Sequence, residues 1–89
     1  MKDRIKQKER EEPLKVSANV EMLKGAYCNS AFIKHSKDDF ILDFIMAESG
    51  EGYLVSKVIT NPSHAKKILK ALKDNVEKYE KSYGEIKTD

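Results

Sequence analysis

Apolar side chains recur between Pro62 and Tyr83 at alternating spacings of four and three residues. This period predicts one long amphipathic helix, because at about 100° per residue the apolar positions fall within a stripe about 100° wide. Lys, Asp and Glu take most of the remaining circumference. Such a stripe must be covered by another apolar surface, and we expect it to form a contact between subunits. The predicted interface residues are Ile68, Leu69, Leu72, Val76, Tyr79 and Tyr83.

Both ends of this helix are marked in the sequence. Asn61 is predicted to cap the first turn, since its short side chain can accept a hydrogen bond from an amide that has no partner within the helix. Pro62 suits the first helical position because its ring fixes φ near the helical value. Gly84 suits the left-handed residue that ends a helix, and Lys81 complements the carbonyl end of the helix dipole.

Four shorter segments before the helix have the pattern of β-strands. Apolar and polar residues alternate from Leu14 onward, and the later segments are rich in β-branched and aromatic residues. Polar turns are expected at residues 36–39 and 48–52. The predicted strands are residues 14–23, 26–35, 40–47 and 53–60. The predicted fold class is α+β: a three- or four-stranded antiparallel β-meander followed by one long C-terminal helix (β-β-β-β-α), with the helix packed on the sheet.

The segment 40–47 carries apolar residues on both faces. Four apolar residues at even positions share one face, and two isoleucines at odd positions lie on the other face with Asp43 between them. Two-sided apolarity in so short a chain implies that one face meets the helix and the other meets a second subunit. A carboxylate at Asp43 must be exposed, paired or given donors, such as a lysine or a backbone amide across an interface. The even-numbered residues are Phe40, Leu42, Phe44 and Met46, and the isoleucines are Ile41 and Ile45.

The composition also favours self-association. A chain of 89 residues makes one domain and buries only about 60% of its unfolded surface, so it needs a further source of stability. The single cysteine, Cys28, excludes an internal disulfide, and two histidines with one cysteine do not make a zinc site. A homodimer whose helices cover the partner's apolar surface is therefore expected. No catalytic residue, metal or cofactor is predicted.

The first thirteen residues differ from the rest of the chain. Residues 1–13 mix charges of both signs without periodicity and are predicted to be a disordered arm, followed by a single domain over residues 14–86 and a tail at 87–89. The arm lacks the apolar segment of a secretory signal, and the longest apolar run elsewhere is far below membrane-spanning length. Together with the lone thiol, these features predict a cytoplasmic protein with no membrane partner.

Positive charge is concentrated on the predicted helix. The whole chain is nearly balanced, with 17 basic and 15 acidic residues, which argues against a strongly cationic coat protein. The helix holds six lysines against three acidic residues, so a phosphate backbone could lie along it. The alternative is a solvated helix surface on which Lys70 pairs with Asp74 and Glu77 with Lys81. The candidate nucleic-acid contacts on the helix are Lys66, Lys67, Lys70 and Lys73.

Two tyrosines and a histidine complete the candidate nucleic-acid site. Tyr27 and Tyr53 are expected at the surface, where rings can stack on unpaired bases with about 1–3 kcal/mol each; packing in the core is the alternative. Phe40 and Phe44 are expected in the core. His64 lies in the first helical turn and is expected either to be a neutral ring bonded to the backbone or a partner, or to contact an anionic ligand.

Three blocks of the sequence resemble one known family. The blocks are Gly25-Ala26-Tyr27 with Asn29, then Phe40-Ile41-Leu42-Asp43-Phe44, then Asn61-Pro62-Ser63-His64-Ala65-Lys66-Lys67 continuing through Leu69, Leu72, Asn75, Tyr79-Glu80 and Gly84-Glu85-Ile86. Over roughly residues 16–86, the chain resembles the prokaryotic family designated domain of unknown function 3467. The resemblance implies a compact cytoplasmic domain of bacterial, archaeal or phage type, and it implies no catalytic residue.

The predicted topology is also similar to that of the Whirly and positive-cofactor-four-like single-stranded DNA-binding proteins, which pair as dimers through their helices. No sequence motif accompanies this similarity, and a fold does not fix a function. We expect a non-enzymatic small cytoplasmic domain that binds single-stranded DNA or RNA as a dimer. The alternative is a protein–protein adaptor, or a structural subunit of a larger assembly, that does not bind nucleic acid.

Overall fold

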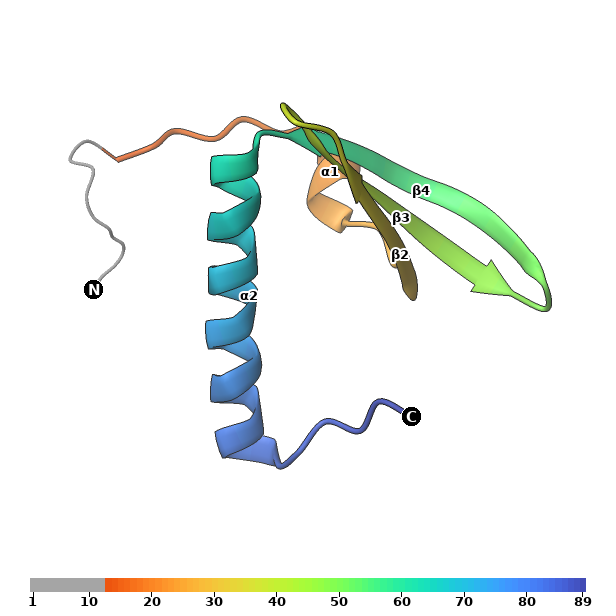
Figure 1. Cartoon of the computed structure of the whole chain (residues 1–89), viewed down its shortest axis with the longest axis vertical. Coiled ribbons are helices and arrows are strands. Elements are labelled where there is room, and N and C mark those ends of the chain that lie inside the picture. Colours follow the sequence, from red (N-terminus) through yellow and green to blue (C-terminus); the bar gives the residue numbers. More distant parts are fainter. Residues whose placement is uncertain (1–12) are drawn as a thin grey trace.

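The computed structural model describes residues 13–89. Its elements follow in the order α1 (Val20–Lys24), β2 (Ser30–His35), β3 (Phe40–Glu48), β4 (Glu51–Thr60) and α2 (Pro62–Tyr83). The three strands form one antiparallel sheet in the order β2-β3-β4, and α2 follows as a C-terminal helix (Figure 1). The predicted α+β class, with three antiparallel strands before one long helix, is confirmed. The predicted arm at residues 1–13 lies outside the described residues except for Pro13.

Both predicted turns join neighbouring strands. Between β2 and β3, the Ser36 amide donates a hydrogen bond of 2.9 Å to the Asp39 carbonyl. Between β3 and β4, Ser49 and Gly50 have φ values of 53° and 82°. Positive φ at both central residues is the requirement of a two-residue type I′ turn, whose twist matches that of the strands it joins. The tight turn lets pairing reach Glu48 and Glu51, so both strands extend slightly beyond their predicted ends.

Strand β2 begins at Ser30, four residues later than predicted. The cause is Asn29, whose side chain makes two hydrogen bonds to the backbone of Ala47 on β3: its Oδ1 accepts from the Ala47 amide at 2.9 Å, and its Nδ2 donates to the Ala47 carbonyl at 3.0 Å. These side-chain bonds occupy backbone groups that a longer β2 would otherwise pair, so the ladder ends here.

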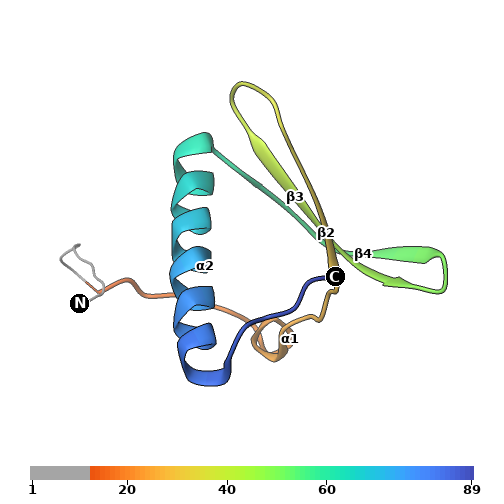
Figure 2. The same ribbon diagram turned by 60° about the horizontal axis from the view of Figure 1, so that its bottom comes forward.

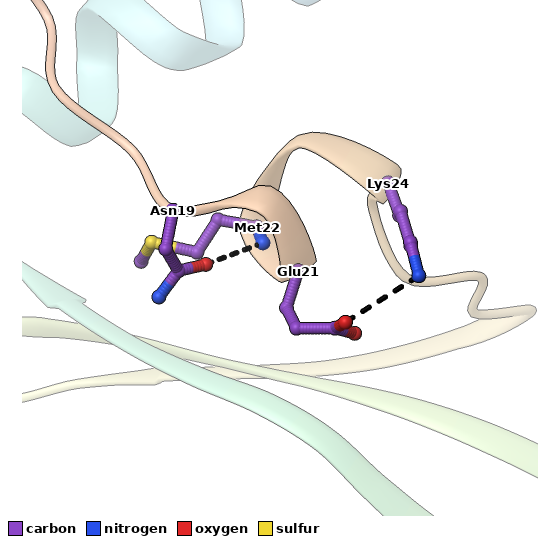
Figure 3. Close-up of polar contacts among 4 residues, drawn as sticks. All are labelled: Asn19, Glu21, Met22 and Lys24. Atoms are coloured by element: carbon purple, nitrogen blue, oxygen red, sulfur yellow. Dashed lines mark hydrogen bonds and ion pairs between the residues drawn. The ribbon is translucent and has the colours of Figure 1, made fainter.

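The predicted first strand, residues 14–23, is wrong. Residues 14–19 belong to no regular element, and Val20–Lys24 form the single-turn helix α1. Local bonds explain the helix: the Asn19 side chain accepts a hydrogen bond from the Met22 amide at 2.8 Å, and Lys24 lies 3.4 Å from Glu21 (Figure 3). Gly25, with φ of 78°, ends the turn. Because alternation produces a strand only beside another strand, capping by Asn19 prevails over it here.

Helix α2 has the predicted bounds and caps. The Asn61 side chain accepts a hydrogen bond from the His64 amide at 2.7 Å, Pro62 occupies the first turn, and the Gly84 amide donates to the Glu80 carbonyl at 2.9 Å. Gly84 has φ of 97°, a conformation that favours glycine. The local signals at both ends were therefore sufficient to define this helix.

The expected packing of α2 on its own sheet is absent, and that prediction is wrong for the single chain. Among the described residues, extensive packing occurs between neighbouring strands, and α2 has no comparable contact with any strand. The helix and the sheet diverge from the end of β4, in both views of the molecule (Figures 1 and 2). The physical reason is the joint between them, since only Asn61 separates the end of β4 from the start of α2.

Candidate interaction surfaces

One face of the sheet, here called the apolar face, is free of charged side chains from Phe40 to Met46 and at the positions paired with them. Directly opposed residues of an antiparallel pair share a face, so the strand register assigns the members of each face. The principal members of the apolar face are Ala31 and Ile33 on β2, Phe40, Leu42, Phe44 and Met46 on β3, and Val58 on β4. The four β3 residues are half-buried by the neighbouring strands, and Ile33 and Val58 are exposed.

The opposite face, here called the charged face, has an ion-pair cluster at its centre. The Asp43 carboxylate lies 2.6 Å from the Lys57 Nζ and 3.8 Å from the Lys34 Nζ, and its side chain is only 14% exposed. Lys34, Asp43 and Lys57 sit side by side on the three strands, because Asp43 pairs with Lys57 and Lys34 pairs with the neighbouring Ile41. The expected lysine partner of Asp43 is confirmed.

Apolar residues surround this cluster on the charged face: Phe32, Ile41, Ile45, Leu54 and Ile59. Toward the β3–β4 turn, Phe32, Ile45 and Leu54 help to line an open hollow of about 490 Å³. A bulge in the register between Phe44 and Ile45 leaves Val55 without an opposite residue and places Leu54 on this face and Tyr53 on the apolar face. Leu54 was not recognised from the sequence as a surface hydrophobic, although the alternation of its strand was available.

The apolar stripe of α2 lies open to solvent. Leu69, Leu72 and Tyr79 are exposed to the extent of 66%, 62% and 50%, and Ile68 is half-buried. The rings of Tyr79 and Tyr83 pack against each other at a centroid distance of 4.9 Å. These predicted interface residues do lie along one helix, and most of them, including Leu69, Leu72, Tyr79 and Tyr83, are largely uncovered.

No side chain between Pro13 and Asp89 is buried. The segment before β2 shows the same exposure: Leu14 and Val16 are 83% and 79% exposed, and Val20, Met22 and Leu23 of α1 are also uncovered. A folded chain with ordered strands and caps but no core of its own exposes apolar area that normally lies inside a protein.

The helix lysines make no ion pair with any acidic residue of the described chain. The ion pairs among residues 13–89 involve Lys24, Lys34 and Lys57, so the expected pairs Lys70–Asp74 and Glu77–Lys81 are not formed. At about 100° per residue, Lys66 and Lys73 lie on the flank of α2 beside Leu69, at the edge of the apolar stripe, whereas Lys70 and Lys67 lie farther round, on the side away from the stripe. These four predicted contacts therefore share a solvated surface.

The predicted tyrosines do not join the lysines in one chain. Tyr27 and Tyr53 are exposed, at 78% and 73%, as expected. Tyr27 lies in the connection between α1 and β2, whereas Tyr53 lies near the β3–β4 turn, at the end of β4 remote from α2 (Figure 1). Within a single chain, these rings and the lysines therefore form separate surfaces.

His64 has a local structural role. Its Nδ1 shares a hydrogen bond of 2.8 Å with the Thr60 hydroxyl, and its backbone amide donates to the Asn61 side chain. Both bonds tie the first turn of α2 to the end of β4. The ring is thus bonded to a neighbouring side chain, which neither expectation named, and contact with an anionic ligand stays a prediction.

The described residues offer little for metal chemistry or for membrane insertion. Between Pro13 and Asp89, no three His, Cys, Asp or Glu side chains converge on a point where a metal ion could bind. Neither described helix has the length and apolarity needed to cross a bilayer. The hollow on the charged face is lined mainly by apolar groups.

A small three-stranded antiparallel sheet with a capped C-terminal helix, and with apolar surfaces in place of an enclosed site, defines a small α+β domain. The chain belongs to the family described as protein of unknown function (DUF3467), whose model matches residues 1–88. No curated protein and no solved structure matches the chain. The resemblance to this family is thus confirmed, and the topological similarity to Whirly and positive-cofactor-four-like proteins stays a prediction.

Proposed function

We propose that this protein is a non-enzymatic interaction module that functions as a homodimer, as an adaptor or structural subunit of a larger assembly in the prokaryotic cytoplasm. The observation that carries the proposal is the absence of any buried side chain among residues 13–89, although α2 and the sheet both present continuous apolar surfaces. A half-buried lone cysteine, Cys28, agrees with a reducing compartment.

The accessible surface supports the proposal quantitatively. The chain exposes 7942 Å², whereas a compact monomer of this mass exposes about 5,300 Å². Suppose that the residues outside the described part contributed the full surface of an unfolded segment, about 2,300 Å². The accessible surface left for residues 13–89 would still exceed that of a compact domain of their mass by roughly 900 Å². Each partner in a stable protein interface gives up about 800 Å². The excess is therefore large enough for a dimer.

Light scattering over a range of chain concentrations tests the dimer directly. One chain has a mass of 10.2 kDa, and the wild-type protein is expected to have twice this mass. Leu72→Lys places a charge in the exposed stripe and is expected to shift the mass toward that of one chain, because an unpaired charge in a dry interface is costly. Lys70→Gln, two residues away and on the side of α2 away from the stripe, is the matched control and should leave the mass unchanged. A folded wild-type monomer at all concentrations would refute the proposal.

Nucleic-acid binding is the second candidate function, and one observation favours it. The helix lysines pair with no carboxylate of residues 13–89, so they are available to phosphate groups. We rank it second because Tyr27 and Tyr53 lie away from these lysines in the single chain. Apposition of two copies is the arrangement that would bring them together.

Titration of a labelled single-stranded oligonucleotide over a salt series separates the two functions. If the lysines contact phosphates, replacing Lys66, Lys70 and Lys73 together by Gln should reduce the salt slope of log K by about two, at about 0.7 per contact. The same variant should keep the mass of the dimer. Lack of binding at low salt would leave the adaptor function alone.

A further inference from the structure

We infer that in this dimer α2 of each copy lies along the apolar face of the other copy's sheet. The inference rests on the proposed function, because it specifies how two copies meet. It is carried by three observations: the short joint after β4, the matching lengths of α2 and β4, and the absence of charge on one face of the sheet only.

The joint prevents α2 from covering its own sheet. Asn61 is the only residue between β4 and α2, and it is extended, with φ of −93° and ψ of 164°. A hydrogen bond of 2.8 Å between the His64 ring and the Thr60 hydroxyl, and one of 2.7 Å from the His64 amide to the Asn61 side chain, hold the corner. One residue spans at most about 3.6 Å, whereas a helix with its side chains has a radius of about 5 Å. The helix cannot be raised onto the face of its own sheet while this corner holds, so another molecule must cover its stripe.

The lengths of the two surfaces suit a second copy of the same chain. Helix α2 has 22 residues and is about 33 Å long. Strand β4 has 10 residues and spans about 33 Å. A partner helix laid along the sheet would therefore cover the full length of the β3–β4 hairpin, and a two-fold axis would give each sheet one helix.

The ion-pair cluster decides which face receives the helix. Seating the apolar stripe on the charged face would remove the Lys34 and Lys57 amino groups from water, and these side chains are now 63% and 44% exposed. Desolvating such charges opposes association. The apolar face presents no lysine or carboxylate opposite Phe40–Met46, and its polar members are His35, Ser56, Thr60 and the Tyr53 hydroxyl, so covering it removes fewer charged groups from water.

This arrangement also accounts for the charge on α2. When the stripe faces the partner sheet, Lys67 and Lys70 on the side away from the stripe stay in water, and Lys66 and Lys73 lie at its edge, where their amino groups can reach solvent. The same helix can thus close the interface with one side and remain solvated on the other.

Disulfide trapping in mixed samples tests the inference. In a Cys28→Ser background, chains carrying Leu42→Cys are mixed with chains carrying Leu69→Cys, Leu72→Cys or Val76→Cys in turn, and oxidised mildly. We expect a covalent heterodimer from at least one of the three pairs, because the three helix positions sample the proposed interface and a disulfide forms where two Cα atoms approach within roughly 4.4–6.8 Å. Ile41→Cys on the charged face and Lys70→Cys on the side of α2 away from the stripe are the matched controls. Ile41→Cys should not crosslink to the stripe cysteines, and Lys70→Cys should not crosslink to Leu42→Cys.

The outcomes separate the inference from the proposed function. Light scattering that gives a dimer, together with crosslinks from the stripe to Ile41→Cys but not to Leu42→Cys, would overturn the inference and leave the dimer standing. A dimer that crosslinks only from stripe to stripe would overturn it as well. A monomer would overturn both.

A measurement on the wild-type protein guards against variants that fail to fold. A dimer assembled from one isotope-labelled and one unlabelled copy should show intermolecular nuclear Overhauser effects between the methyl groups of Leu69 or Leu72 and those of Leu42 or Val58. Their absence, with such effects between stripe residues instead, would also overturn the inference.

Discussion

The two faces of the sheet are built from alternate residues of the same strands, but they make different demands on their surroundings. The charged face satisfies its most polar group internally, since Asp43 lies between Lys34 and Lys57, and the lysine amino groups remain in water. The apolar face has no polar cluster and no cover in the single chain. In the arrangement that we infer, the charged face is an exterior surface and the apolar face is covered by the partner's helix. Three substitutions test this contrast, from the largest expected effect to the smallest.

Leu42 and Ile41 give the sharpest test, because they are neighbours on β3, face opposite sides and are both half-buried in the single chain. If a second copy covers the apolar face, Leu42→Ala should lower the free energy of unfolding by about 2–5 kcal/mol, as for a buried leucine. Ile41→Ala should cost less than half as much. Urea denaturation at a fixed chain concentration measures both, and equal losses would contradict the contrast.

Asn61→Ala addresses the corner that directs α2 away from its own sheet. Loss of the cap should lower the free energy of unfolding by about 1 kcal/mol, since the His64 amide loses its acceptor. Thermal unfolding followed by circular dichroism measures the loss. Asn61→Asp retains a side-chain oxygen and should recover most of the stability; no difference between the two variants would argue against the cap.

Asp43→Asn addresses the charged face and should have the smallest effect. Because both lysine partners are well exposed, solvent screens the ion pairs, and we expect a loss of about 0.5–1 kcal/mol that shrinks at high salt. Urea midpoints at low and high ionic strength measure it. A salt-independent loss as large as that of Leu42→Ala would mean that the charged face is covered too.

Local signals made α2 predictable, whereas longer-range pairing limited the prediction elsewhere. Asn61, Pro62 and Gly84 act on their own neighbours, so the helix bounds followed from the sequence. The alternation that begins at Leu14 gave no strand, because a strand needs a neighbour and the Asn19 cap offered a helical turn instead. The early end of β2 depends on Asn29 reaching Ala47, 18 residues away, a contact that no local pattern reveals.

The candidate surfaces were predictable to a similar degree. Six residues of the stripe and the four lysines followed from helical periodicity alone. The two lysines that pair with Asp43, Lys57 and Lys34, could be identified only from the strand register. The face occupied by Tyr53 depends on the bulge at Val55, which shifts the pairing by one residue. The separation of α2 from its sheet depends on the length of one joint, which apolar periodicity does not report.

If two copies complete each other's hydrophobic interior, as we propose, the final step of folding depends on the meeting of two chains. Completion of the hydrophobic interior becomes a second-order event, so the melting temperature should climb as the sample is concentrated. In a cell, a low concentration of the protein would leave more of it as monomers with exposed apolar surfaces, which proteases degrade first. A high concentration would favour the protected dimer. In that case, the lifetime of each molecule in the cell would depend on the concentration of the protein.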